Sequence, residues 1–351
     1  MFKRMPRALA YSLALLVIVA NTFNLGADIG GMAAGAHLLA PIPTVVWVIF
    51  FGLGLIAAEI WLSYAVIARI FKWLTVVLFA YIITAFIVHP PWTQILVSFV
   101  IPTVHFDSSW LSTMVGVLGT TITPYLFFWQ SSLMVEEDKK AGNTTIASRR
   151  GTTQDAICDA HTDINAGMIY SNLVAAFIII TTAATLGAWC AGAHGKHDIA
   201  TAQDAAQALR PLAGDFAALL FTLGMVGTGI LAVPVLATSS AYVLTETFKF
   251  REGLSEKPRR AKAFYAVIVT GIVIGVAMNL LNVDPIKALF WSAVLNGVAA
   301  VPLNVIVWLA SDRKIMKHWS SSRIAVGWGW AAVALMGAAA GGMFYFMATG
   351  T

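Results

Sequence analysis

Three threonines and a proline interrupt an apolar stretch that is otherwise long enough to cross a bilayer. The run is GTTITPYLFFWQSS, and its polar centre holds Thr120, Thr121, Thr123 and Pro124. Proline lacks an amide hydrogen and disfavours the helical conformation at the preceding residue, so we expect a helix break at Thr123–Pro124. Hydroxyl and freed carbonyl oxygens at such a break can bind a cation inside a membrane. The alternative is a plain kink whose carbonyls are satisfied by the threonines themselves.

A second set of polar residues lies in the run ANTFNLGADIGG. Asn21, Asn24 and Asp28 recur at helical spacing and share one face of the expected helix. An ionisable group inside a membrane helix is costly, so Asp28 marks a functional position by default. The asparagines either line the same pathway or only join neighbouring helices. Asn296, in WSAVLNGVAAVPLN, lies where Gly297 and a following proline allow a helix to bend beside a cavity.

The composition places these residues in a membrane protein. The chain has 351 residues, of which 59% are hydrophobic and 11% charged. Several apolar runs reach the length needed to span a bilayer core. We predict an all-α polytopic protein with one transmembrane domain, residues 1–351, and nine spans at about 8–33, 43–68, 73–88, 111–134, 164–190, 213–245, 262–281, 286–310 and 325–347.

The placement of basic residues predicts the orientation. With the N-terminus in the cytoplasm, all 22 Lys and Arg residues fall on the inside except Lys196, Arg210 and Lys287. Cytoplasmic loops carry such an excess, so we predict a multi-pass protein of the cell (inner) membrane with a cytoplasmic N-terminus. This asymmetry also accounts for the net charge of +5, so the expected partner is the lipid bilayer and not nucleic acid.

Several enzyme signatures are absent from the sequence. It has no glycine-rich phosphate loop ending in Lys-Ser or Lys-Thr, no HExxH and no cysteine pair at zinc spacing. We therefore expect no enzyme and no resident cofactor, with any metal ion being a substrate.

The chain resembles the Nramp family of divalent-metal transporters over nearly its whole length. The resemblance is strongest in ANTFNLGADIGGMAAG, from WTQILVSFVIP through TTITPYLFFWQSS, and in LGMVGTGILAVPVLATSSAY. It implies the inverted-repeat fold of the bacterial leucine transporter and secondary transport of divalent cations. The family's metal-binding pattern Ala-x-x-Met-Pro-His falls on Thr120 to Tyr125, so Thr120 and Thr123 are the implied metal ligands. Asp28, Asn24, Tyr125 and Asn296 are then expected to line the pathway.

The departures from the family pattern change which ion the site is expected to bind and which ionisable groups surround it. Thr123 replaces a soft thioether by a hard hydroxyl, which favours Mg²⁺ or Mn²⁺ and likens the chain to the Nramp-related magnesium transporters. The acid that usually follows the family's third-helix Asp by three residues is Gly31 here, and the ninth-helix arginines have no match. The tenth-helix glutamine falls on Ala293, leaving Asn296 one turn on as a substitute.

The first predicted span matches the family's third helix and not its first. The family's first helix carries an Asp-Pro-Gly-Asn-type motif, and we find no such broken, acid-bearing helix before residue 111. Threonine hydroxyls carry no formal charge, so we expect the chain alone to transport no divalent cation and to need a two-helix segment or an oligomer. The alternatives are a non-transporting remnant and a subunit of a split transporter. An amino-acid transporter of the same fold is less favoured, because no half-helix glycine motif for a carboxylate is evident.

The predicted topology can be tested by labelling. Single cysteines at Gly253 and His197, in a chain whose Cys158 and Cys190 are changed to serine, should react with an impermeant maleimide from opposite sides. Gly253 should react from the cytoplasm, because it lies in a basic loop. Labelling of both positions from one side would contradict the nine-span arrangement.

Overall fold

The structure, a computed structural model, describes residues 7–61, 79–143, 145, 148, 151, 153–184, 201–208, 216–254, 256–281, 283–304, 308–309, 311–316 and 319–349. Within these residues the regular elements are all helical. They are α1 (Arg7–Leu39), α2 (Thr44–Trp61), α4 (Phe79–Val88), α5 (Trp92–Val100), α6 (Ser108–Thr121), α7 (Pro124–Lys140), α8 (Gln154–Thr182), α10 (Ala202–Ala208), α12 (Ala217–Phe248), α13 (Lys262–Leu280), α14 (Pro285–Leu303), α16 (Arg313–Met316) and α17 (Arg323–Thr349).

Eight helical stretches in the described part are long and apolar enough to cross a membrane, with Ser108–Lys140 taken as one stretch. This confirms the predicted all-helical, multi-pass class. The third predicted span, 73–88, begins outside the described residues, and α4 covers the rest of it.

Some helices extend beyond their predicted apolar cores. α8 begins at Gln154, before the start of the predicted span 164–190, and Thr153 caps it by accepting a hydrogen bond from the Ala156 amide at 3.2 Å. Helical hydrogen bonding does not require apolar side chains. Hydropathy therefore locates the buried length of a helix and not its ends.

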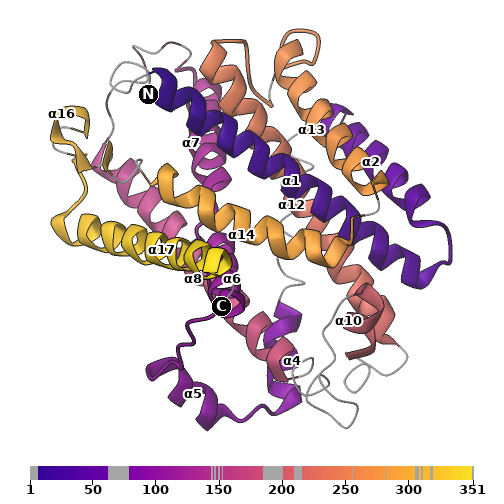
Figure 1. The fold of residues 1–351 in the computed structure, drawn as a ribbon. Helices are drawn as coiled ribbons and strands as arrows, with labels where there is room; N and C mark the ends of the chain where they lie inside the picture. Colours follow the sequence, from indigo (N-terminus) through magenta and orange to yellow (C-terminus); the bar gives the residue numbers. More distant parts are fainter. Residues whose placement is uncertain are drawn as a thin grey trace.

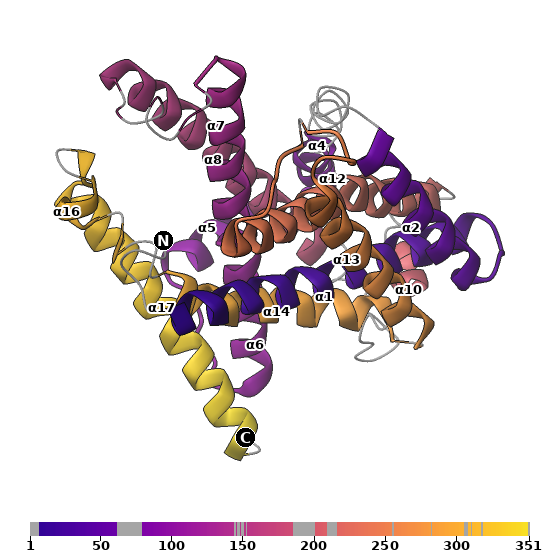
Figure 2. The same cartoon turned by 90° about the horizontal axis from the view of Figure 1, so that it is seen from above.

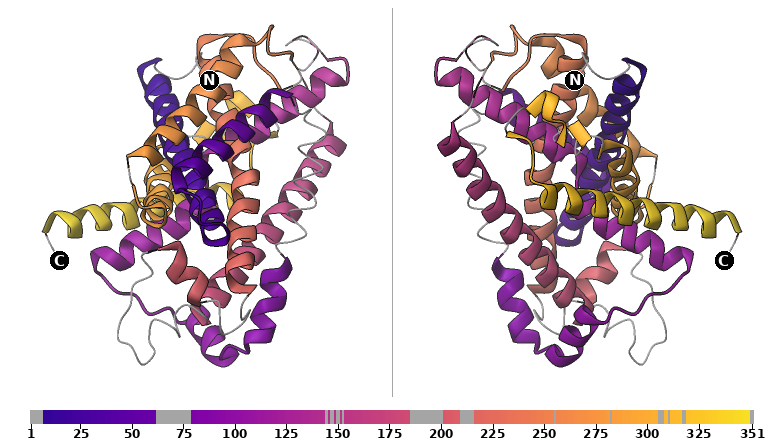
Figure 3. Two further views of the ribbon diagram at one scale, coloured as in Figure 1. Left: turned by 90° about the vertical axis from the view of Figure 1, so that its right-hand side faces the viewer. Right: turned by 90° about the vertical axis from the view of Figure 1, so that its left-hand side faces the viewer.

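The first helix, α1, runs through the middle of the bundle (Figures 1 and 2). It packs against α12, α14, α13 and α2. Its residues Leu25, Ile29, Met32 and Ala33 are fully buried in the largest apolar cluster. Helix α17 projects on one side of the molecule and α8 lies on the opposite side (Figure 3). The residues of α1 therefore face protein on several sides, which is unusual for a membrane helix.

Helices α6 and α14 cross through a pair of glycines. A Cβ added at Gly119 would meet the Gly297 amide and the Ala293 carbonyl, and one added at Gly297 would meet the Val115 carbonyl. Backbone atoms cannot yield as a flexible side chain can. Small residues permit such close helix contact in membrane proteins, and this crossing positions the end of α6.

We expect Gly119→Ala to destabilise the protein by about 1–3 kcal/mol, because the added methyl group collides with backbone across the crossing. The measurement is thermal unfolding in detergent. Gly54→Ala is the matched control, since the Cβ there meets open space and alanine favours a helix over glycine. Equal melting temperatures for the two variants would contradict the packing described here.

Candidate functional site

The apolar span is broken at Ile122 and Thr123. Helix α6 ends at Thr121 and α7 begins at Pro124, with Ile122 at φ −112°, ψ 65° and Thr123 extended at φ −78°, ψ 121°. The Ile122 amide still donates to the Leu118 carbonyl at 2.9 Å. Pro124 has no amide hydrogen, so the Thr120 carbonyl lacks the donor that an uninterrupted helix would give it.

The two threonines that were predicted as metal ligands face different surroundings. Thr123 is 6% exposed, and its Oγ1 has no hydrogen-bond partner within the described part of the chain. Thr120 is exposed, and its hydroxyl donates to the Val117 carbonyl at 2.8 Å. A buried hydroxyl without a partner is costly unless something else binds it. The buried Thr123 hydroxyl therefore has the Tyr125 side chain as its polar neighbour, whereas the Thr120 hydroxyl is engaged within its own helix.

Tyr125 connects the break to two other helices. Its side chain is a close polar neighbour of Thr123 and lies within electrostatic reach of Asp28 on α1. Its backbone carbonyl accepts a hydrogen bond from Ser239 on α12 at 2.8 Å. Sequence reasoning did not single out Ser239 as a site residue, although the polar run TSS at 238–240 in an apolar helix was the available signal. The break, Asp28 and Ser239 therefore meet in one region.

Asn24 on α1 and Asn296 on α14 form a reciprocal pair. Asn24 Nδ2 donates to Asn296 Oδ1 at 2.9 Å, and Asn296 Nδ2 donates to Asn24 Oδ1 at 3.2 Å. Both side chains are buried. One turn earlier, Asn21 Nδ2 donates to Ser240 Oγ at 3.0 Å. The asparagines that were predicted to share one face of α1 thus form hydrogen bonds with two neighbouring helices, α12 and α14.

The position of the family's second acid on this helix has no room for a carboxylate. A Cβ at Gly31 would lie 2.5 Å from the Met225 methyl group and 3.2 Å from Leu289 Cδ1. These side chains occupy the space that a glutamate would need. Position 31 of α1 therefore offers Asp28 no neighbouring acid.

Glu59 is a buried acid on α2. It is 2% exposed, and neither carboxyl oxygen has a hydrogen-bond partner among the residues described. Its electrostatic neighbour is Tyr265 on α13. Because this neighbour lies on α13 and not on the broken helix, we do not include Glu59 in the candidate site.

Comparison with known proteins finds relatives that match most of the chain. The family described as "Natural resistance-associated macrophage protein-like" (Nramp) matches residues 1–346. The divalent metal cation transporter MntH of Klebsiella pneumoniae is 27% identical over 262 residues, which are 73% of this chain and 56% of that protein. MntH of Caldanaerobacter subterraneus is 25% identical over 259 residues, covering 72% and 55%. The chain spans about half the length of the curated relatives it matches.

A solved structure shows the same fold. The Eremococcus coleocola manganese transporter, in complex with an aromatic bis-isothiourea substituted compound, superposes with a TM-score of 0.60 at 17% identity. The match covers 96% of this chain and 72% of that one. This confirms the leucine-transporter-like architecture predicted from the sequence resemblance.

We expect Asn24→Ala to lower the melting temperature in detergent, because it leaves the buried Asn296 amide without its partner. The cost should be about 0.6–2 kcal/mol, the range for interhelical polar contacts in membranes and for lost hydrogen bonds. The double variant with Asn296→Ala should cost less than the sum of the two single variants. Strict additivity would mean that the two amides do not interact.

Proposed function

Because the chain belongs to the Nramp family, whose match runs over residues 1–346, we propose that it carries divalent metal cations across a membrane by secondary transport. The observation that carries the proposal is the buried Thr123 hydroxyl, next to the Tyr125 side chain, at a break in a membrane-spanning helix. Backbone that is not helical is tolerated at that depth only against protein or a hydrated cavity. In secondary transporters, such breaks supply oxygen ligands to ions.

The donor set favours a hard cation. Thr123 supplies a hydroxyl oxygen, and the carbonyl of Thr120 lacks its helical donor. Oxygen ligands suit Mg²⁺ and Mn²⁺, whereas sulfur suits softer metals. We therefore propose Mg²⁺ or Mn²⁺ as the transported ion. The MntH relatives are divalent metal cation transporters and the structural relative is a manganese transporter, which agrees with this class of substrate.

Asp28 is the charge that this chain itself offers beside the hydroxyl and carbonyl, and a single carboxylate balances only half of a divalent charge, in keeping with the expected need for a further segment or a second copy. A divalent ion stripped of water in an apolar region requires compensating charge. Asp28 lies within electrostatic reach of Tyr125, which follows Thr123 by two residues in the chain. We assign Asp28 as the counter-charge of the site, Tyr125 as the group between it and Thr123, and the Asn24–Asn296 pair as a wall of the pathway.

The proposal also includes the membrane in which the chain lies and the partners with which it acts. The split of basic residues supports a multi-pass inner-membrane protein with a cytoplasmic N-terminus. The second candidate function is that of a subunit acting with a further helical segment or a second copy. It is favoured by the exposure of Thr120 beside the break.

We expect Thr123→Met to improve Cd²⁺ binding relative to Mn²⁺ and Mg²⁺ by about tenfold or more, because a thioether is a softer ligand than a hydroxyl. Calorimetric titration of the purified full chain with each metal measures the ratio. Thr113→Met is the matched control, since Thr113 lies on the exposed side of α6 and donates to the Ser109 carbonyl. An unchanged Cd²⁺ to Mn²⁺ ratio in Thr123→Met would remove Thr123 from the set of ligands.

A further inference from the structure

Helix α7 is fastened to the bundle mainly by α12. It packs against that helix and only slightly against α1 and α14. At its first turn, the Tyr125 carbonyl accepts from Ser239 at 2.8 Å. Because the break at Ile122–Thr123 interrupts helical hydrogen bonding to α6, the rest of α7 is held by the packing of Phe128 and Trp129 and by contacts near its far end.

Those far contacts converge on one buried carboxylate. Glu136 is 6% exposed, and its Oε1 accepts hydrogen bonds from the Tyr242 hydroxyl on α12 and from the Leu254 amide at 2.7 Å. Leu254 lies in the segment between α12 and α13. The Tyr242 ring also packs edge-on against Phe264, with ring centroids 4.8 Å apart. Glu136 thus joins α7, α12 and the following loop.

The backbone conformation of the loop after α12 places the Leu254 amide beside Glu136. Lys249, at φ 58°, ends α12 in a left-handed turn, and Gly253 has φ 130°. A Cβ at Gly253 would lie 2.9 Å from Glu136 Oε1, so glycine permits both the backbone angle and the close approach. A labelling cysteine at Gly253 would therefore disturb this contact, and exposed Lys257 is the better position in the same loop.

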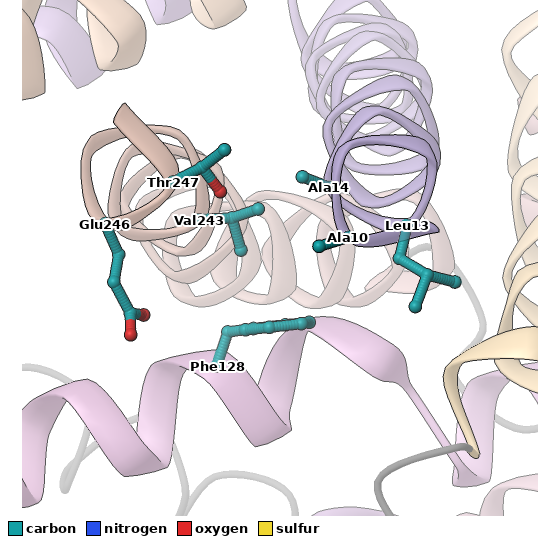
Figure 4. Close-up of a pocket in the computed structure, with 7 residues that line it drawn as sticks. All are labelled: Ala10, Leu13, Ala14, Phe128, Val243, Glu246 and Thr247. Atoms are coloured by element: carbon teal, nitrogen blue, oxygen red, sulfur yellow. The ribbon is translucent and has the colours of Figure 1, made fainter. Parts of the chain in front are cut away.

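A small cavity lies beneath α7 on the side that faces α1. It measures about 30 Å³ and is lined by Ala10, Leu13, Ala14, Phe128, Val243, Glu246 and Thr247. Figure 4 shows Phe128 extending from α7 toward Ala10 and Leu13 of α1, with Val243 and Glu246 of α12 beside it. A cavity of this size holds about one or two water molecules. It lies along α7 between the break and the end held by Glu136.

We infer that Glu136 is a positioning residue that holds α7 closed over this cavity, with Phe128 as the closing side chain. Release of Glu136 from Tyr242 and Leu254 lets α7 pivot about Ile122–Thr123, which opens the cavity toward the break. The role of this movement in ion release rests on the proposed function. The contacts of Glu136 with Tyr242 and Leu254 are a property of the fold, so their effect on α7 can be measured without any metal.

The test follows the accessibility of Ala14→Cys in the full chain with Cys158 and Cys190 changed to serine. The readout is its rate of modification by a methanethiosulfonate reagent in detergent. Glu136→Ala should raise the rate by about tenfold, as expected for the loss of hydrogen bonds to a charged acceptor. Glu136→Gln should restore most of the protection, because its amide oxygen still accepts from Leu254 and Tyr242. A merely destabilised helix would not be rescued in this way.

Two further variants complete the test. Tyr242→Phe removes one donor and keeps the ring, so it should give an intermediate rate, and it replaces Glu136→Ala if that variant does not fold. Thr222→Val is the matched control, because it removes the buried hydrogen bond from Thr222 to the Gly35 carbonyl, 2.6 Å long, away from α7. A rate for Glu136→Ala or Tyr242→Phe no faster than that of Thr222→Val would overturn the inference. The Thr123→Met titration tests only metal binding, and the cysteine modification rate tests only the role of Glu136. Failure of one experiment therefore leaves the other interpretable.

Discussion

The arrangement depends on one constraint, which is that backbone polar groups in apolar surroundings need partners. The break at Ile122–Thr123 violates the usual solution of a continuous helix. The break lies among other helices: α12 brings Ser239 to the Tyr125 carbonyl beside it, and Thr123 lies buried against protein. Lipid offers no hydrogen bonds, so a break of this kind must be surrounded by other helices. The position of the break therefore determines which helices have to meet around it.

The same constraint explains the central helix α1. It is buried on several sides, so its polar groups have to find partners on neighbouring helices. The Asn24 amide pairs with Asn296, and the Gly26 carbonyl accepts from Asn279 at 2.7 Å. Close approach at Gly26 makes the last contact possible, since a Cβ there would lie 3.1 Å from the Met278 sulfur. Small residues and amide pairs thus lock α1 to α13 and α14 as a rigid frame.

The broken helix combines a fixed half with a more loosely held half. Helix α6 is locked to α14 through Gly119 and Gly297, where backbone meets backbone. Helix α7 has no comparable crossing among the described residues and is held by the packing of Phe128 and Trp129 and by hydrogen bonds near its two ends. Hydrogen bonds can be exchanged more easily than interlocked backbones can be separated. This difference in attachment is the reason why we propose α7, and not α6, as the half of the span that moves.

The sequence alone determined the membrane class and most of the spans, because hydropathy and proline chemistry act within one segment, and its resemblance to the Nramp family implied the fold. Pro124 lies where α7 begins, since the lost amide and the restricted preceding residue are local effects. Only the tertiary structure decided that Thr123 is buried and Thr120 exposed, that Asn24 faces Asn296, and that Glu136 meets Leu254. Each of these depends on how two helices are rotated against one another, often across more than 100 residues of chain. Spacing shows which residues share a helix face, but only packing determines which neighbour that face meets.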